Sequence, residues 1–543
     1  MRKYIKNIRI FIVGQILFDL VSTICIGYKP VIQKKIFDDY STLSLRDILY
    51  LLGLYFCLIL LNVLLQYICM LLSWKGAVHF ERDMKKDLFH AVFNMKKDKF
   101  FEKQTGEYVS LQANDITAIE SDYLQPFIDL IRSANMFVVY GVILWIYVDK
   151  RIAITMMIMS VITGLLPKAL SKSMDSKRAK YQDQLSTYTA KITDLLDGIM
   201  VINKKTFNSI DNKHGEELDK VAEKRYSYGK AKTTAIDLDL FAMLLMEFVA
   251  IGMAAIFLVK GRITLGAAVA TLSYISSFTD PLNSILYDVT SIQSVKNIRD
   301  KFINYVGNIE KDEANEKERK SVNDFDRLSF ENVSYEIGNF SLKNVKADFV
   351  KGKKYALIGD NGGGKSTIMK LIMEYISPSA GSIKIDGCSI DSLDTSGLIA
   401  YVDQKEHIYA ENMENNVSVF GAYGNCDDAI KKTSDSAKVY NLMRNLFLAK
   451  KTDIDCSKFS GGQKQTIAFM RMLARDFKIV LLDESFSAMD PESKEAYSDF
   501  IFNSNEMKDK TVIMITHDTG KENLSRFDEV YKLSNGEIVR LAV

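Results

Sequence analysis

The sequence has few cysteines, almost no net charge and no recognisable cleavable signal peptide. Its six cysteines in 543 residues are too few for a disulfide scaffold, and none is spaced as CxxC or as a Cys/His metal site. A hydrophobic content of 48% excludes a wholly disordered chain. A formal net charge of +2 argues against a protein that coats nucleic acid, so we expect no nucleic-acid partner.

Apolar residues are concentrated in the first 300 positions. A helix needs about 20 apolar residues to cross a hydrocarbon core of about 30 Å. Six runs approach that length, and the second includes an uncharged stretch from Ile48 to Met70. A buried soluble helix can also be apolar all round, but six such runs favour six membrane spans. They lie near residues 10–29, 47–73, 126–148, 152–170, 235–258 and 265–290.

The connections between these runs alternate between short and long. The two long ones, after the second and fourth runs, are rich in lysine, and residues 171–235 hold thirteen Lys or Arg. The positive-inside rule places them and the basic N-terminus in the cytoplasm. They lack Pro and Gly runs, and stretches such as Phe80 to Phe89 predict charged amphipathic helices. Such rigid legs suggest coupling to a cytoplasmic partner, although a solvated helical hairpin without a partner is the alternative.

No cleavage site of small residues follows the first run, so we expect it to remain as a helix. It starts about ten residues from Met1, and we therefore expect no protease domain before it. We divide the chain into a membrane domain at 1–305, a charged linker at 306–324 and a second domain at 325–543. The second domain alternates short β-like and helical runs, as α/β proteins do.

The strongest motif lies early in the second domain and matches G-x-x-x-x-G-K-[ST]. A predicted buried strand precedes it and a predicted helix follows it, as a phosphate-binding loop requires. The backbone N–H groups of such a loop wrap the phosphates, Lys365 reaches the β- and γ-phosphates, and Ser366 ligates Mg²⁺. The candidate ATP ligands are Gly359, Asp360, Asn361, Gly362, Gly363, Gly364, Lys365, Ser366 and Thr367.

A second element is an apolar strand, Ile479 to Leu482, that ends in two carboxylates. Asp483 is suited to hold Mg²⁺, and Glu484 is placed to polarise an attacking water. A strand that ends at two surface acids is common by itself. Downstream of a phosphate-binding loop, the pair predicts ATP hydrolysis.

Between these two elements lies Phe459-Ser460-Gly461-Gly462-Gln463, and here the sequence resembles the ATP-binding-cassette family, whose signature is L-S-G-G-Q. The resemblance implies that two cassettes enclose ATP between the phosphate loop of one subunit and the signature of the other. It implies that Gln404 touches Mg²⁺ and takes part in catalysis, and that His517 is the switch histidine. Signature and D-loop residues that would meet ATP across the dimer are Ser460, Gly461, Gly462, Gln463 and Asp490.

The first half resembles the exporter-type membrane domain of this family. The fold class is therefore expected to be multidomain, with an all-α six-helix membrane domain followed by an α/β P-loop ATPase domain. The segments Thr105 to Ser110 and Asn114 to Ile116 resemble the surroundings of the first coupling helix, and Asp197 to Ile199 with Phe207 resemble the second loop.

Two departures from the family pattern concern the nucleotide and the coupling contacts. Tyr335 is the candidate to stack on adenine, but the more usual position for that aromatic residue is Ile337. The segment from Thr452 to Lys458 is shorter than the usual V-G-E-x-G pattern before the signature.

Three acids in or near the apolar runs, Asp19, Glu247 and Asp280, suggest a cavity for cationic or amphipathic cargo. Alternatively they lie at helix ends or pair with one another, and Arg132 lies near the third run. Asp280-Pro281 is expected to interrupt the sixth run.

We expect an ATP-driven exporter half-subunit in a bacterial cell membrane, with ATP and Mg²⁺ as cofactors and a peptide or an amphipathic cation as cargo. If the cargo is a peptide, we expect its leader segment to be removed by a protease other than this chain. Its partner is a second half-subunit, with a homodimer favoured over a heterodimer because all catalytic motifs are present. A lipid flippase and an ATP-gated channel or regulatory membrane protein are the alternatives.

Overall fold

The structure is a computed structural model that describes residues 1–95, 97–101, 103, 105–165, 168–317, 319–338, 340–360, 362–450, 455–534 and 536–541. These residues form two compact units. The first comprises Met1–His90 and Tyr108–Tyr305, and the second comprises Ala91–Glu107 and Val306–Val543. The segment Ala91–Glu107 thus belongs to the second unit although helices of the first flank it in sequence.

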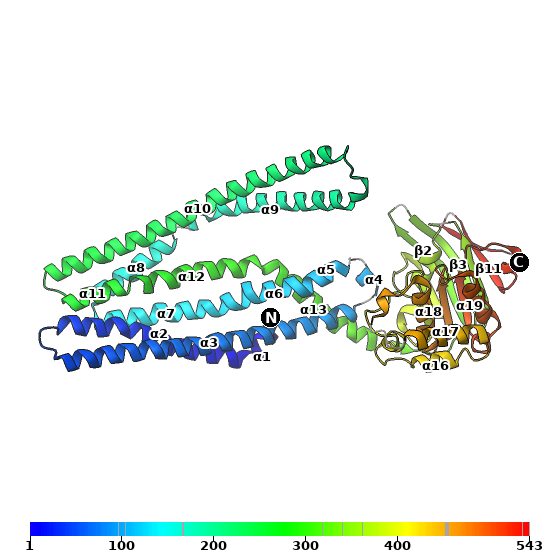
Figure 1. The fold of residues 1–543 in the computed structure, drawn as a ribbon, viewed down its shortest axis with the longest axis horizontal. Helices are drawn as coiled ribbons and strands as arrows, with labels where there is room; N and C mark the ends of the chain where they lie inside the picture. Colours follow the sequence, from blue (N-terminus) through cyan, green and yellow to red (C-terminus); the bar gives the residue numbers. More distant parts are fainter. Residues whose placement is uncertain are drawn as a thin grey trace. The chain divides into compact units, whose positions relative to one another are not determined.

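The first unit is built from helices that run side by side (Figure 1). Five elements from α5 to α7 follow one another without a break and include two π-helical stretches, η1 and η2. The helices are α1 (Arg2–Asn7), α2 (Arg9–Asp38), α3 (Leu45–Phe93), α5 (Thr105–Ser110), η1 (Leu111–Asp115), α6 (Ile116–Ile119), η2 (Glu120–Leu124), α7 (Gln125–Tyr147), α8 (Lys150–Leu165), α9 (Lys168–Asp197), η3 (Ile199–Val201), α10 (Phe207–Val259), α11 (Leu265–Ser273), α12 (Ile275–Ser294) and α13 (Lys296–Lys317).

Within the described residues, four helices are long and apolar enough to cross a membrane: Arg9–Asp38, Leu45–Phe93, Thr105–Tyr147 and Phe207–Val259. They contain the first, second, third and fifth predicted runs. The fourth run is shared between α8 and α9, and residues 166 and 167 lie outside the described part. The sixth run is divided between α11 and α12. The count of six spans therefore stays a prediction.

Many apolar side chains of the long helices point outward rather than into a core. In the apolar window of α3 only 11% of the residues are buried, and Phe56, Leu60 and Leu64 are all more than half exposed. In water these side chains would lose the roughly 25 cal/mol per Å² that burial contributes. A lipid environment removes this cost, because acyl chains cover the apolar surface.

The N-terminal helix α1 packs along the polar half of α3. Lys3 Nζ lies 2.6 Å from Asp87 Oδ2, and the Tyr4 hydroxyl donates a hydrogen bond of 2.8 Å to the same oxygen. The Tyr4 ring also meets Phe80 edge to face at 6.1 Å between centroids. The N-terminus thus lies beside the charged stretch that the sequence predicts to be cytoplasmic.

The second long connection is helical, as predicted, and its two helices, α9 and α10, run antiparallel (Figure 1). Helix α9 ends at Asp197, η3 forms the turn, and α10 begins at Phe207. Met200 in this turn is 93% exposed. The apolar tip is available for contact with another protein surface.

The sixth predicted run is interrupted at a different residue from the expected one. Helix α12 continues through Asp280 and Pro281, whereas the break between α11 and α12 falls at Tyr274. Tyr274 is fully buried, and its hydroxyl donates a hydrogen bond to the carbonyl oxygen of Gly27 in α2. The predicted interruption at Pro281 was therefore wrong, and the break falls instead at a residue that contacts another helix.

The described residues of the second unit form three sheets. The largest has the strand order β12-β11-β4-β10-β9-β8, in which all neighbours are parallel except β11 and β12. An antiparallel sheet has the order β3-β2-β5-β6, and β1 pairs with β7. The strands are β1 (Lys320–Ser321), β2 (Arg327–Ile337), β3 (Phe340–Val350), β4 (Lys354–Gly359), β5 (Ala380–Ile385), β6 (Cys388–Ser389), β7 (Leu393–Asp394), β8 (Ile399–Val402), β9 (Ile479–Asp483), β10 (Thr511–Ile515), β11 (Glu529–Ser534) and β12 (Glu537–Leu541).

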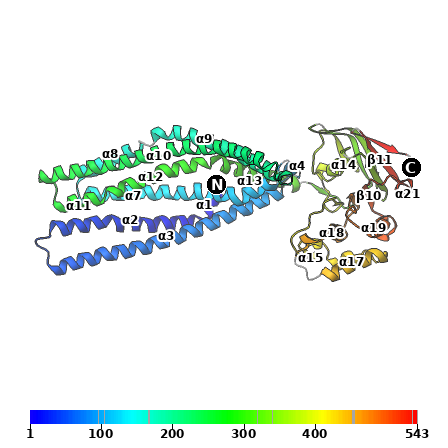
Figure 2. The ribbon, with the colours of Figure 1, turned by 45° about the horizontal axis from the view of Figure 1, so that its top comes forward.

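Helices and turns complete the second unit, and Figure 2 shows α15, α17 and α18 together on one side of it. The described elements are α4 (Lys97–Phe101), α14 (Lys365–Ile372), η4 (Ile390–Ser392), α15 (Met413–Ser418), α16 (Cys426–Lys431), α17 (Ala437–Lys450), η5 (Cys456–Lys458), α18 (Gly461–Leu473), α19 (Pro491–Asn503), α20 (Asn505–Lys508) and α21 (Lys521–Leu524).

The central strands β4 and β9 are almost wholly apolar and buried, as strands covered on both faces must be. The predicted linker is helical as far as Lys317, and its end joins the second unit through the pairing of β1 with β7.

Candidate active site

The large sheet gathers the predicted catalytic residues at one edge. Strands β4, β10, β9 and β8 are parallel neighbours, so their carboxyl ends meet there, where parallel α/β sheets bind ligands. The phosphate loop follows β4, Gln404 follows β8, and Glu484 follows β9 directly. His517 stands two positions after the end of β10. Residues more than 150 positions apart are thereby placed at a common edge.

The phosphate loop holds its lysine in place through its own backbone. Lys365 is buried, and its Nζ donates hydrogen bonds to the carbonyl oxygens of Gly359 at 2.8 Å and Asp360 at 2.9 Å. The Gly363 N–H donates to the same Asp360 carbonyl at 3.0 Å. Helix α14 begins at Lys365, so its first N–H groups face the loop and favour an anion. Of the predicted residues, Asn361 lies outside the described part of the chain.

Two glycines of this loop are required by backbone conformation and by close contacts. Gly359 has φ +145°, and a Cβ there would lie 2.2 Å from the carbonyl oxygen of Leu533. Gly364 has φ +100°, and a Cβ there would lie 2.7 Å from Leu342 Cδ2 and 2.9 Å from Phe340 Cζ. Residues of strands β11 and β3 therefore lie close against these two glycines.

Glu484 is held between two other predicted catalytic residues. Gln404 Nε2 donates a hydrogen bond of 2.8 Å to Glu484 Oε2, and His517 Nε2 contacts Glu484 Oε1. Glu484 also has φ +46°, a conformation that non-glycine residues adopt rarely and mainly at functional sites. A cavity of about 130 Å³ lies beside Glu484 and His517. The carboxylate is oriented by both of its oxygens and can accept a proton from a water molecule.

Asp483 provides an oxygen donor that suits a divalent cation. It is 5% exposed, and the Tyr401 hydroxyl lies 3.5 Å from its Oδ2. Burial raises the pKa of Asp483 above its ordinary value, and a hydrogen bond from Ser366 acts in the opposite direction. Carboxylate, hydroxyl and amide oxygens are the ligands that Mg²⁺ prefers. The donor set of Asp483, Ser366 and Gln404 therefore fits Mg²⁺.

The signature segment begins helix α18 with a reciprocal pair of caps. The Ser460 hydroxyl accepts from the Gln463 N–H at 3.4 Å, and Gln463 Oε1 accepts from the Ser460 N–H at 3.1 Å. Ala488 packs closely against both glycines, because a Cβ at Gly461 would lie 3.0 Å from its Cβ and one at Gly462 would lie 3.3 Å from its carbonyl oxygen. Ser460 and Gly461 are exposed at the start of the helix. The helix N-terminus is thus presented at the surface, where it can meet an anion.

Sequence reasoning missed a glutamine that joins the signature helix to the predicted D-loop. Gln465 is 4% exposed, and its Oε1 accepts a hydrogen bond of 3.1 Å from the Ala488 N–H. Asp490, two residues further on, caps α19 by accepting from the Ser493 N–H at 2.9 Å. The glutamine follows the recognised motif by two positions, and only the fold shows its partner.

The adenine contact proposed for Tyr335 has a competing role in the structure. Tyr335 is half buried and packs against the apolar cluster between the two larger sheets, whereas Ile337 is 61% exposed. Stacking by Tyr335 stays a prediction. Of the unusual segment before the signature, residues 451–454 lie outside the described part, and Cys456–Lys458 form η5.

Sequence reasoning also missed an ion pair that joins the Gln404 loop to the signature helix. Glu406 Oε1 accepts from the Asp403 N–H at 2.5 Å, and Glu406 Oε2 lies 3.6 Å from Arg471 of α18. Arg471 also donates to the backbone oxygens of His407 at 3.1 Å and Asn416 at 2.8 Å. Burial raises the pKa of Glu406 to about 7.

We expect Glu406→Gln to flatten the pH dependence of stability between about pH 4.5 and pH 7. Because the folded pKa of Glu406, about 7, lies above its ordinary value of 4.5, the folded protein keeps a proton that the unfolded chain has lost. This contribution to stability is fully present below pH 4.5 and is lost as the pH rises through 7. Glutamine keeps the shape and does not titrate.

The measurement is thermal unfolding of the full chain by circular dichroism at pH 5 and pH 8. Glu495→Gln, on an exposed position of α19, is the control and should keep the wild-type difference. If the stability of Glu406→Gln differed between pH 5 and pH 8 as much as that of the wild type does, the raised pKa of Glu406 would be contradicted.

The three acids proposed for a cargo cavity are placed differently in the first unit. Asp19 is 3% exposed, and its Oδ1 lies 3.0 Å from Arg132 Nε of α7. Arg132 also donates to Gln66 Oε1 at 3.3 Å. Asp19 therefore has a pairing partner, the arrangement that the sequence left open as the alternative. Glu247 is half buried and Asp280 is exposed.

Two family models match this chain. A model of the ABC transporter transmembrane region matches residues 11–282, and a model of the ABC transporter matches residues 342–487. The transport/processing ATP-binding protein ComA of Streptococcus pneumoniae is 24% identical over 527 residues, which cover 93% of this chain and 71% of that protein. The ATP-dependent lipid A-core flippase of Syntrophus aciditrophicus is 24% identical over 481 residues, which cover 84% of this chain and 76% of that protein.

Among solved structures, a bacterial Atm1-family ABC exporter with ATP bound has a TM-score of 0.78 at 16% identity. The match covers 98% of this chain and 94% of that chain, so the two share their fold.

Proposed function

We propose a specific function for this chain within the ABC transporter family, to which it belongs: it is one half of a dimeric exporter for a peptide or an amphipathic, cationic compound. The chain is an ATP-hydrolysing exporter of a bacterial membrane. It has a helical transmembrane domain followed by an α/β nucleotide-binding domain that is cytoplasmic. One domain of each kind makes half a transporter, so it dimerises in the lipid bilayer.

The observation that carries the catalytic proposal is the position of Glu484 between Gln404 and His517 at the edge of the large sheet. We assign Lys365 and the loop N–H groups to the phosphates and Glu484 to the attacking water. His517 then holds the Glu484 carboxylate in orientation, and Gln404 holds its other oxygen. When bound, Mg²⁺ would neutralise charge on the phosphate oxygens, and Asp483, Ser366 and Gln404 would hold it.

The exposed signature helix supports the proposal that each ATP lies between two subunits. Ser460 and Gly461, at the start of α18, are exposed, and a γ-phosphate from the partner's site would suit this positive helix end. Because every catalytic motif is present in this chain, we favour a homodimer with two active sites over a heterodimer.

The cargo proposal rests on acids in the membrane domain and on the relatives. Glu247 and Asp280 are not fully buried and are candidates to face a cationic group. The name of ComA records transport and processing. Lipid export is the second candidate, because a relative covered over 76% of its length is named a lipid A-core flippase.

The test is ATPase stimulation of the reconstituted protein across peptides, amphipathic cations and lipids. We expect peptides or cations to raise the rate, and charge-neutral Glu247→Gln to weaken that response without changing the basal rate. Stimulation by lipids alone, with translocation of a fluorescent lipid, would favour the flippase instead. Ion currents without cargo would favour a channel. Glu216→Gln, on the cytoplasmic leg formed by α10, is the matched control.

A further inference from the structure

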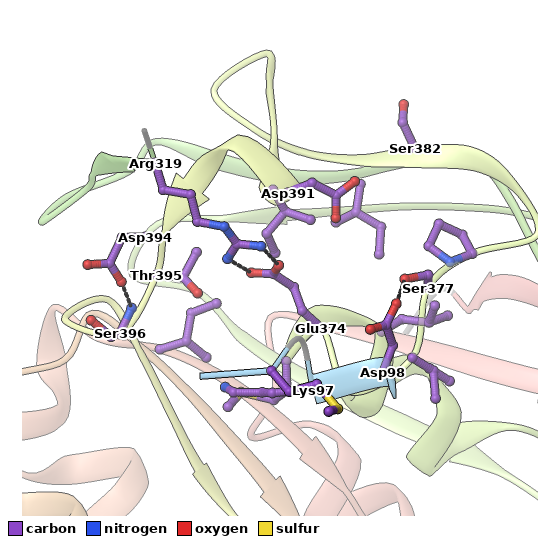
Figure 3. Close-up of a pocket in the computed structure, with 18 of the residues that line it drawn as sticks. Lys97, Asp98, Arg319, Glu374, Ser377, Ser382, Asp391, Asp394, Thr395 and Ser396 are labelled. Carbon is purple, nitrogen blue, oxygen red and sulfur yellow. Dashed lines mark hydrogen bonds and ion pairs between the residues drawn. The ribbon is translucent and has the colours of Figure 1, made fainter. Parts of the chain in front are cut away.

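The short helix α4 rests on the segment that directly follows the phosphate-loop helix. Both belong to the second unit. Helix α14 ends at Ile372, and the Ser377 hydroxyl donates a hydrogen bond of 2.7 Å to Asp98 Oδ2 of α4 (Figure 3). The same contact borders a cavity of about 370 Å³ lined by polar and apolar residues. Helix α4 is separated by only three residues from α3, the long helix that contains the second predicted span.

This segment is held in position from the opposite side by the end of the linker. Arg319 donates two hydrogen bonds to the Glu374 carboxylate, at 2.9 Å and 3.3 Å (Figure 3). Glu374 has φ +55°, which a non-glycine residue adopts only when its surroundings hold it there. A bidentate pair of this kind fixes orientation as well as distance. The residues that follow Glu374 are therefore presented to α4 in one defined arrangement.

Tyr375 is the residue of this segment that makes the aromatic contacts. The Phe101 ring of α4 lies 5.0 Å from the Tyr375 ring, and Lys97 Nζ lies 5.1 Å from the same ring. On its other side, the Tyr375 ring meets Tyr401 edge to face at 6.1 Å. Among the described residues, these contacts all involve the aromatic ring of Tyr375 and not its hydroxyl.

Tyr401 connects this aromatic group to the catalytic edge. It lies in β8, beside β9, and its hydroxyl lies 3.5 Å from Asp483 Oδ2. The Tyr401 hydroxyl is a hydrogen-bond donor, and the Asp483 carboxylate is an acceptor. The hydroxyl can therefore donate to the carboxylate, and a donor of this kind orients a metal-ligating carboxylate.

We propose that Tyr375 and Tyr401 are positioning residues that connect helix α4 to Asp483, the proposed Mg²⁺ ligand. The proposal rests on the proposed function, because it deepens the assignment of Asp483. Movement of α4 displaces the Tyr375 ring, the Tyr401 ring follows because the two are in contact, and the Tyr401 hydroxyl turns the Asp483 carboxylate. At Tyr375 the ring is required, and at Tyr401 the hydroxyl is required.

The test measures binding of Mn²⁺ to the full chain in lipid nanodiscs with a non-hydrolysable ATP analogue, by electron paramagnetic resonance of free Mn²⁺. We expect Tyr401→Phe and Tyr375→Leu each to weaken Mn²⁺ binding about tenfold, the lower end of the range for partners of metal ligands. Tyr375→Phe keeps the ring and should bind as the wild type does. Tyr423→Phe, which changes a tyrosine hydroxyl elsewhere in this unit, is the matched control.

A double-substitution cycle tests the connection to α4. Phe101→Ala should weaken Mn²⁺ binding in the wild type and have no further effect in Tyr401→Phe, because both act through one path. The proposal is overturned if Tyr401→Phe binds Mn²⁺ as tightly as the wild type, or if Tyr375→Phe weakens Mn²⁺ binding as much as Tyr375→Leu does. It is also overturned if the losses of Mn²⁺ affinity caused by Phe101→Ala and Tyr401→Phe add in the double variant. Because no cargo is used, the Mn²⁺ result can be interpreted even if the export proposal fails. Loss of Mn²⁺ binding in Asp483→Ala verifies separately that Asp483 belongs to the metal site.

Discussion

Replacing Glu484 with glutamine should lower the ATPase rate by at least about 100-fold while ATP still binds. Glutamine keeps the size and can still contact Gln404 and His517, but its amide does not accept a proton from water as a carboxylate does. The phosphate loop is untouched, because Lys365 is held by the carbonyl oxygens of Gly359 and Asp360. The substitution therefore separates hydrolysis from binding.

The measurement pairs phosphate release with the affinity for a fluorescent ATP analogue. Glu495→Gln, on the exposed face of α19, is the control and should keep both values. We also expect ATP to hold the Glu484→Gln dimer closed, seen as an ATP-dependent crosslink between the signature segment of one subunit and the phosphate loop of its partner. A Glu484→Gln protein that hydrolyses ATP at a tenth of the wild-type rate or faster would contradict the assignment of the base.

Replacing Gly359 with alanine should destabilise the nucleotide-binding domain by about 3 kcal/mol or more and abolish ATP binding. Two costs combine at this position. The backbone has φ +145°, and the new Cβ would lie 2.2 Å from the carbonyl oxygen of Leu533 in the neighbouring strand β11. Because the close atom belongs to backbone, no side-chain rotation relieves the contact.

Gly352 provides the matched control, since it lies just before the same strand β4 and has φ +76°, and a Cβ added there would have no atom within 4 Å. Gly352→Ala should cost only about 1 kcal/mol, the conformational part alone. Both tryptophans, Trp74 and Trp145, lie in the first unit, so unfolding of the second is better followed by circular dichroism and by ATP affinity. If Gly359→Ala and Gly352→Ala lost equal stability, the close contact with Leu533 would make no contribution to the cost of Gly359→Ala.

The nucleotide motifs could be located from the sequence because each depends on neighbouring residues. A phosphate loop needs glycines and a lysine at fixed spacing between a strand and a helix, and the structure has β4 before Gly359 and α14 after it. The carboxylate pair needs only a buried strand that ends, and β9 ends at Asp483. The charged legs were also predictable, since long lysine-rich segments without glycine or proline runs favour helices, as α9 and α10 show.

Contacts between distant residues could not be predicted in this way. Arg132 was noticed as a charge, but its pairing with Asp19 joins α2 to α7 across more than 100 positions. The helix break falls at Tyr274, whose partner Gly27 lies in another helix, and not at Pro281, where local stiffness suggested it. Helix α4, which packs within the second unit through Asp98, precedes by a few residues the segment that resembled the coupling region.

The sequence by itself therefore determined the class of the protein, the two kinds of domain and the residues that can handle ATP, because these follow from local spacing and from the length of apolar runs. The scarcity of cysteine and of net charge excluded other classes for the same reason. Only the tertiary structure decided how Glu484 is oriented, that Glu406 meets Arg471, and that Tyr401 reaches Asp483. These depend on which strands and helices lie side by side, and side-chain packing over long separations sets that arrangement.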